Sequence, residues 1–464
     1  MLSSGKLGFG GLTALVLGLV VGVGIYNLPQ NMSAAASPGA VALSWLITGA
    51  GILPLVMIFK YLSEKYPRYN AGLYQYAQAG FGNYVGFNIA WGYWLCSAFS
   101  NVTYGVMLND SVGAFFPALL RHGVATVVFC SVLIWVMYWI VSRGVKTAKT
   151  INSLLAVVKV VMIAFIIVVF IIFFKASLFE ADIWGTSPGD LPLGTQISGT
   201  MMITLFCFFG VEGAVMMSAR AKKSSDVGRA GIAGFVIALL LYLAVSLLCF
   251  GLMSKARLAG LSDPSIAYIL RDTCGEWAYW FVIVAVIISL LGGWVAWTLI
   301  VAQVPYEASL AGIMPKAFSR VNRHNMPAFG LVASSLAMEV FLLLVVMADD
   351  VYLTALRITG LMIIPCYFFT ALFLLKQRTS ARVKTLAVVA TLFCVWMAYA
   401  GGLVDMIMTS FFYLAGIGFY IRVRREHRGH LPMFTSKEKL CLLFLTACAI
   451  FTVVQLALTH GSIA

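Results

Sequence analysis

Apolar segments of about 20 residues recur along the whole chain. A helix of that length, at 1.5 Å rise per residue, crosses a hydrocarbon layer about 30 Å thick. The segments are continuous and do not alternate apolar with polar residues, so they predict transmembrane helices and not barrel strands. The composition agrees, because 61% of the residues are hydrophobic and 10% are charged, whereas soluble domains carry roughly 25% charged residues. We therefore predict an all-α polytopic membrane protein.

The apolar segments predict about thirteen spans in a single transmembrane domain, residues 1–464. The spans are expected at residues 12–32, 40–60, 84–108, 122–142, 152–174, 197–218, 231–253, 278–302, 328–348, 351–375, 383–401, 405–421 and 439–459.

Lysine and arginine are divided unequally between the segments that join these spans. With a cytoplasmic N-terminus, 24 of the 31 basic residues fall in inner segments, 5 in outer segments, and Lys159 and Arg357 within spans. Cytoplasmic loops are enriched in lysine and arginine, so we predict a multi-pass protein with its N-terminus in the cytoplasm. The net charge of +14 then reflects loops that face an anionic leaflet and does not indicate nucleic-acid binding.

The first span contains poor helix formers, in the sequence GLVVGVGIYNLPQNM (residues 18–32). Glycine costs about 1 kcal/mol and proline about 3 kcal/mol in a helix interior. The sixth span is interrupted in a similar way, in TLFCFFGVEGAVMM (residues 204–217). Paired interruptions in corresponding spans of two halves indicate a transporter's binding site. We therefore expect breaks at Gly22–Gly24 and near Gly210, and an inverted pair of repeats, residues 12–174 and 197–375, followed by additional helices at 383–459.

Four charged residues lie inside predicted spans, where each is costly. Glu212 follows a glycine at the expected second break, which favours a functional role. Lys159 and Arg357 lie about two turns from span ends, so either could extend to the membrane surface. Glu339 is interpreted as a structural acid that pairs with a neighbouring helix.

Other function classes lack their signatures in the sequence. The nine cysteines occur singly without a CxxC motif, and the five histidines lie in loops or near span ends. An enzyme would need a catalytic constellation, a channel would need a ring of charges, and an ATP-driven pump would need a phosphate-binding loop. We expect no enzymatic activity, no metal and no cofactor.

Several motifs together resemble the amino acid–polyamine–organocation superfamily, in particular its basic amino acid/polyamine antiporters, the bacterial arginine/ornithine and arginine/agmatine exchangers. The motifs are GVGIYNLPQNM, WGYWLCSAFSNV, TLFCFFGVEGA, LGGWVAWTLIVAQVP and LAGIMPKAFSRVN, and the resemblance covers roughly residues 10–420. It implies a LeuT-like fold, a location in the bacterial inner membrane, an amino acid or amine as substrate, and a homodimer as one expected assembly.

The resemblance also implies roles for individual residues. The substrate carboxylate would meet the N–H groups of the first break, and its amino group the carbonyls of the second. The implied substrate-binding residues are Gly22, Val23, Gly24, Ser97, Asn101, Phe206, Cys207, Phe209, Trp297 and Thr359. Glu212 would be a gating or proton-coupling acid. Lys159 would lie between spans 1 and 8 and replace the sodium ion of sodium-coupled relatives.

Three positions depart from the family's pattern. Val23 stands where a serine is common, and Phe206 replaces a tryptophan, although phenylalanine is the weaker partner for a cation. Arg357 near the pocket would repel a guanidinium unless an acid pairs with it; Glu212 is one candidate and Glu339 the other. We predict exchange of arginine, ornithine or lysine for a related amino acid or amine, with Arg357 affecting specificity. Exchange of histidine for histamine, exchange of tyrosine for tyramine, and proton-coupled symport remain alternatives.

Overall fold

The computed structural model describes residues 8–69, 72–144, 159, 161–186, 190–216, 221–348, 350–427 and 433–461. These residues are almost entirely helical, because backbone polar groups in a hydrocarbon layer must be bonded within the segment. The first part of the chain forms α1 (Phe9–Val20), η1 (Val23–Asn27), α2 (Leu28–Ala35), α3 (Pro38–Lys65), α4 (Leu73–Phe81), α5 (Asn83–Gly113), η2 (Pro117–Arg121), α6 (Val124–Ser142), an apolar helix Val161–Ile172 and α8 (Ala176–Glu180).

The second part of the chain contains the remaining helices. They are α9 (Leu193–Cys207), α10 (Gly213–Met216), α11 (Ser224–Leu248), η4 (Cys249–Gly251), α12 (Lys255–Ala259), α13 (Ser265–Cys274), α14 (Glu276–Leu310), η5 (Lys316–Ser319), α15 (Ala328–Val345), α16 (Val351–Lys376), α17 (Ala381–Ala400), α18 (Leu403–Met408), α19 (Ser410–Leu414), α20 (Ile417–His427) and α21 (Ser436–Gly461).

Eight of the described helices are long and apolar enough to cross a membrane, and counting two bent pairs as single spans gives ten. The prediction of a polytopic helical membrane protein is therefore confirmed. The first part of the predicted fifth span, residues 152–158 and 160, lies outside the described residues.

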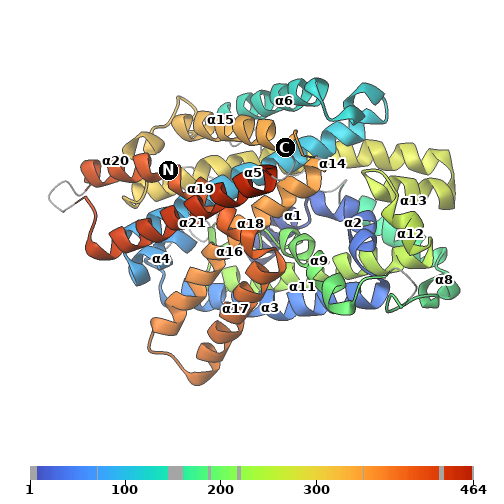
Figure 1. Ribbon diagram of the computed structural model, residues 1–464, viewed down its shortest axis with the longest axis horizontal. Coiled ribbons are helices and arrows are strands. Elements are labelled where there is room, and N and C mark those ends of the chain that lie inside the picture. The colour runs from blue at the N-terminus through green and yellow to red at the C-terminus, as the bar shows by residue number, and fades with distance from the viewer. Residues whose placement is uncertain are drawn as a thin grey trace.

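Helix α5 lies in the middle of the molecule. Nearly all of its residues are buried, and it packs against α4, α14, α15 and α16 (Figure 1). Large apolar side chains are instead exposed on α6, α15, α17 and α21, for example Val132, Leu336, Leu392 and Leu443. An outer surface of this kind suits contact with lipid, whereas a soluble monomer rarely exposes such large apolar patches.

Contacts between loops bring the basic segments together at one end of the molecule, which we call the basic side. Four hydrogen bonds join these ends: Tyr66 to Gln377 (3.2 Å), Lys376 to the Gly80 carbonyl (2.8 Å), Asn322 to the Ser142 carbonyl (2.9 Å), and the Lys316 N–H to Glu426 (2.6 Å). The opposite end carries α8, α12 and α13, at the right of Figure 1. The long helices run between these two ends.

The predicted twelfth span, residues 405–421, corresponds to a bent pair of helical segments, Leu403–Leu414 and Ile417–His427. The chain bends by 43° between Leu414 and Ile417. A Cβ atom at Gly416 would lie 2.9 Å from the Trp91 ring, so the turn passes too close to α5 for a side chain there. This close approach depends on the tertiary packing and cannot be read from local hydropathy.

Candidate functional site

The first helix breaks where its glycines predicted. Helix α1 ends at Val20, η1 restarts at Val23, and the two halves are bent by 48°. The first N–H groups of a new helix have no partner within it and carry partial positive charge. A Cβ atom at Gly22 would lie 2.5 Å from the Tyr104 hydroxyl, and one at Gly24 would lie 3.1 Å from the Cys207 sulfur. The break is thus a buried strip of bare backbone.

The second break follows α9, which ends at Cys207, and α10 resumes at Gly213. Gly210 has a φ of +103°, in the region that glycine enters without the steric cost of a Cβ. A Cβ atom there would also lie 3.0 Å from Trp297 and 3.1 Å from Leu19. The predicted break near Gly210 is confirmed, and it lies directly against α1.

Tyr242 of α11 connects the two breaks. Its hydroxyl lies 2.6 Å from the carbonyl oxygen of Val20 and 2.9 Å from that of Cys207. These are the last residues of α1 and α9, the points at which both helices stop. The ends of the two interrupted helices therefore share one hydrogen-bonding group.

Lys159 reaches the first break from the fifth apolar segment. Its side chain is buried, and its ammonium donates to the carbonyl oxygens of Val21 (2.8 Å) and Gly18 (3.5 Å). The alternative in which Lys159 extends to the membrane surface is therefore wrong. Its predicted contact with the first span is confirmed, while its place beside span 8 and its role as a replacement for sodium stay predictions.

Glu212 is fully buried beside the second break and is held by two tyrosines. Its oxygens accept hydrogen bonds from the hydroxyls of Tyr93 (2.7 Å) and Tyr367 (2.8 Å) and from the N–H of Gly210 (3.2 Å). Within the described part of the chain no lysine or arginine forms an ion pair with it. Glu212 thus ties the second break to α5 and α16 through neutral donors.

A cavity of about 240 Å³ lies between the two breaks and is called the central cavity. Seven of the ten predicted substrate-binding residues line it: Gly22, Val23, Gly24, Phe206, Cys207, Phe209 and Trp297. Ser100 and Tyr104 of α5, which sequence reasoning did not identify, complete its polar lining.

The remaining three predicted substrate-binding residues do not line this cavity. Ser97 donates to the Tyr93 carbonyl (2.7 Å), and the Asn101 amide donates to the Ser97 carbonyl (2.8 Å), so both are engaged along α5. The Thr359 hydroxyl is buried and forms no hydrogen bond with a described residue. Contact of these three side chains with substrate stays a prediction.

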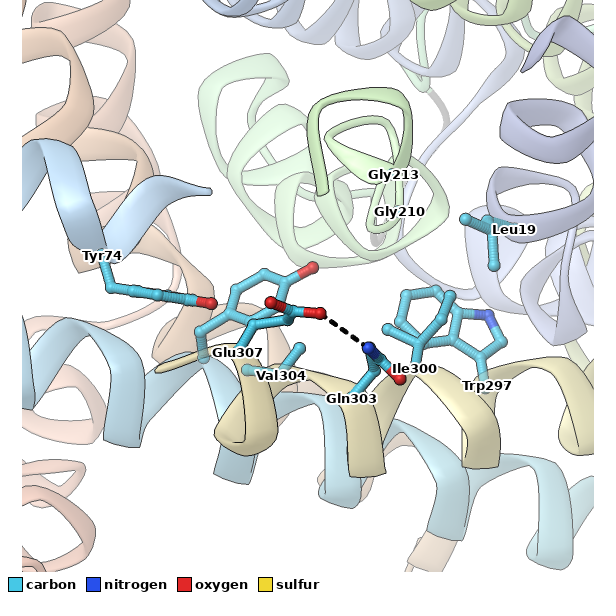
Figure 2. A pocket seen from close by; sticks show the side chains of 10 residues that line it. Leu19, Tyr74, Gly210, Gly213, Trp297, Ile300, Gln303, Val304 and Glu307 are labelled. Carbon is cyan, nitrogen blue, oxygen red and sulfur yellow. Dashed lines mark hydrogen bonds between the residues drawn. The ribbon is translucent and has the colours of Figure 1, made fainter. Parts of the chain in front are cut away.

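A second cavity, of about 420 Å³, lies on the basic side of the first (Figure 2). Phe209 and Trp297 stack between the two, with ring centroids 4.8 Å apart and planes inclined by 18°. Leu19 and Trp297 line both cavities. We call the second one the basic-side cavity.

The expected pairing of Arg357 with Glu212 or Glu339 is wrong. Arg357 instead forms an ion pair with Asp405 (2.5 Å), and its side chain is 53% exposed. Its position near the end of α16 lets the long side chain reach a surface acid at lower desolvation cost than a buried one. Glu339 accepts a hydrogen bond from Ser131 of α6 (2.6 Å), as expected of a structural acid. An effect of Arg357 on specificity stays a prediction.

Among the described residues, no group of three histidine, cysteine or acidic side chains could hold a metal ion. What the site offers is a cavity inside a helical membrane protein, bounded by two helix breaks that expose backbone. Irregular backbone at membrane depth is tolerated where it lines such a cavity, and this arrangement defines a membrane transporter.

Comparison with known proteins gives the family. A family model described as amino acid permease matches residues 7–418, so the chain belongs to this family. The chain is 37% identical to an arginine/agmatine antiporter of Chlamydia trachomatis serovar L2 over 462 residues, 96% of each chain. It is 38% identical to the protein of that name from Chlamydia abortus over 470 residues, 97% of each chain. The chain is therefore an amino acid transporter and not an enzyme.

Proposed function

We propose that the chain is an antiporter that exchanges a basic amino acid, namely arginine, ornithine or lysine, for a related amino acid or its decarboxylated amine. The observation that carries this choice of substrate is the 37% identity, over 96% of the chain, to a protein named as an arginine/agmatine antiporter. The site supports it through three features: the first break, the aromatic walls of the central cavity, and Glu212.

The first break suits the carboxylate of an amino acid. Gly22, Val23 and Gly24, at the start of η1, line the central cavity. Helix N-termini bind anions through free N–H groups and the helix dipole. Because these donors belong to the backbone, the replacement of a common serine by Val23 removes a hydroxyl and leaves them in place.

The aromatic walls suit a cationic side chain. Phe206, Phe209 and Trp297 line the central cavity, and a cation over an aromatic face gains about 2 kcal/mol when it is desolvated. Tryptophan is the strongest partner, so Trp297 supplies most of this attraction in a chain that has phenylalanine at position 206.

The position of Glu212 is suited to the role of a gate on the basic side of the central cavity. The contacts of its carboxylate with Tyr93 and Tyr367 join the second break to α5 and α16, and the Phe209–Trp297 stack lies beside it. Opening toward the basic side would break these hydrogen bonds, and closing would restore them.

The architecture that accompanies this function is an inverted pair of five-helix repeats, residues 12–174 and 197–375, with helices at 383–459 added and thirteen spans in all. It is supported by the two breaks, which fall at the first helix of each repeat. We propose that the basic side faces the cytoplasm of a bacterial inner membrane, since the basic loops gather there. A homodimer is expected as the assembly.

The test is exchange in proteoliposomes. Vesicles loaded with agmatine, ornithine or no substrate would be offered radiolabelled arginine outside, with unlabelled lysine, histidine and tyrosine as competitors. We expect uptake that depends on internal substrate and is inhibited most by basic amino acids. Uptake into empty vesicles driven by a proton gradient would instead support symport, and stronger competition by histidine or tyrosine would support the other exchange pairs.

A further inference from the structure

The basic-side cavity contains a carboxylate that the proposed exchange does not use. Of the residues that line this cavity, Glu307 of α14 is the charged one, and its side chain is partly exposed. The Gln303 amide donates to Glu307 Oε1 at 2.8 Å, as Figure 2 shows. The second oxygen, Oε2, accepts no hydrogen bond from a residue in the described ranges. One face of the carboxylate is thus fixed and the other is open to the cavity.

The position of Glu307 in its helix is electrostatically unfavourable. It lies in the last turn of α14, which ends at Leu310. The C-terminus of a helix carries partial negative charge, which stabilises cations and destabilises anions. A bound cation would relieve this repulsion, whereas the neutral amide of Gln303 relieves little of it.

Tyr74 of α4 provides a second and independent observation. Its side chain is fully buried, and its hydroxyl forms no hydrogen bond with any residue that the structure describes. Buried hydroxyls nearly always have a partner. In Figure 2 the hydroxyl points into the same space as the Glu307 carboxylate. A ligand with N–H donors would satisfy the hydroxyl oxygen and the carboxylate together.

The remaining walls suit the same kind of ligand. Tyr93 and Trp297 bring aromatic rings to the cavity, and such rings attract a desolvated cation. Tyr93 is also a donor to Glu212, so the cavity adjoins the contact that closes the central site. The loops around this end are rich in lysine and arginine, so an approaching cation meets repulsion until it reaches the carboxylate.

We propose that the basic-side cavity is a second binding site for the ammonium or guanidinium end of the substrate. Glu307 acts as its counter-ion, and Gln303 and Tyr74 fix its position, one step before the central cavity on the basic side. This proposal rests on the proposed function, because it takes the substrate to be a basic amino acid or its amine.

The experiment measures substrate affinity separately at the two faces of the membrane. Right-side-out and inverted membrane vesicles from an expression host would be loaded with arginine, and the KM for external arginine and agmatine would be measured for each face. We expect Glu307→Gln to raise the KM at the basic face about tenfold, as loss of one charge-assisted hydrogen bond implies, with the KM at the other face unchanged. Glu307→Asp should restore part of the affinity, and Tyr74→Phe should raise the same KM less.

Two controls make the result specific. Glu339→Gln removes another acid of the membrane region that lies outside the cavity, and it should leave both KM values unchanged. Citrulline, which has the shape of arginine without its charge, should inhibit wild type and Glu307→Gln equally at the basic face.

An unchanged KM at the basic face, or an equal rise at both faces, would overturn the second site. Wild-type vesicles that fail to exchange arginine would instead contradict the proposed function itself. Monodisperse elution of each variant in detergent shows that a loss of affinity is not a loss of folding.

Discussion

The two helix breaks face the same cavity but are built from different chemistry. The first is bare backbone, because side chains at positions 22 and 24 would come too close to neighbouring residues. Lys159 donates a hydrogen bond to the carbonyl oxygen of Val21. The second carries a charged side chain, Glu212, held by Tyr93 and Tyr367 from two other helices. The cation of Lys159 thus contacts the first break, whereas an anion of the second break accepts hydrogen bonds from two separate helices.

This difference assigns different tasks to the breaks. In the proposed function, backbone N–H groups of the first break meet the carboxylate, which every amino acid carries, so the first break would bind without selecting a side chain. The hydrogen bonds of Glu212 with Tyr93 and Tyr367 can break when these tyrosines move, so the second break is suited to the proposed role of a gate. Selection among substrates is then left to the walls between the breaks, where Phe206, Phe209 and Trp297 lie.

The largest expected effect comes from filling the first break. Gly22→Ala would place a methyl group 2.5 Å from the Tyr104 hydroxyl, and because that rigid side chain is itself buried, it cannot move away cheaply. Overpacking of this kind costs about 1–3 kcal/mol, so exchange should fall about 10- to 100-fold. The matched control is Gly18→Ala in the same helix, where a Cβ meets open space. Equal loss in both variants would contradict the special role of the break.

A smaller effect is expected from the gate. Glu212→Gln keeps the shape of the side chain and removes its charge, so it weakens the hydrogen bonds from two tyrosines. Initial exchange rates should fall about tenfold. Tyr93→Phe and Tyr367→Phe should each cost less, and their double variant should deviate from additivity because both bind one carboxylate. Strictly additive losses would show that the two tyrosines act independently.

Substitution of Lys159 should reduce exchange less than the gate variants do, since Lys159 contacts the first break from outside the central cavity. Lys159→Ala leaves the buried carbonyl of Val21 without its donor and should reduce the exchange rate a few-fold, in line with about 1 kcal/mol per hydrogen bond. Wild-type rates in sodium and in choline buffers should be equal if the ammonium replaces a coupling ion. Lys175→Ala, at an exposed lysine, is the control. A strict sodium requirement would refute this role.

The smallest effect is expected from an ion pair that lies outside both breaks, at the end of α5. His122 binds Asp110 (2.6 Å), and this hydrogen bond raises the pKa of His122 above its ordinary value of 6.5. The stabilisation is therefore complete below pH 6.5 and is lost as pH rises through the higher pKa of the folded state. His122→Gln should lower the free energy of unfolding at pH 5.5 by about 1 kcal/mol or less, seen as a lower Tm, and should hardly change Tm at pH 9. His324→Gln is the control, and equal loss at both pH values would contradict the pair.

The class of protein and both breaks could be predicted because membrane burial leaves strong local signals. Long apolar segments must be helices, and glycines cluster where backbone is exposed to a cavity. Lys159 and Glu212 were conspicuous for a related reason, since an intramembrane charge is expensive.

The partners of these residues could not be predicted, because they come from distant helices and are ordinary tyrosines in apolar surroundings. Tyr104, Tyr242 and Tyr367 have no motif that separates them from packing residues. The ion pair of Arg357 with Asp405 could not be predicted for a similar reason, since Asp405 lies beyond the next helix, α17. Glu307 lies beyond the predicted span 278–302, because α14 extends past the apolar segment to Leu310.

The hydroxyl of Tyr242 has a further consequence for how the two breaks respond to substrate. It carries one hydrogen and faces two carbonyl acceptors, those of Val20 and Cys207, so strengthening one bond weakens the other. The two interrupted helices are therefore thermodynamically linked, and linkage is reciprocal: whatever free energy the first exerts on the second is returned in equal measure. A substrate that binds from one face of the membrane and a substrate that leaves toward the other face therefore both shift the same conformational equilibrium of the two interrupted helices.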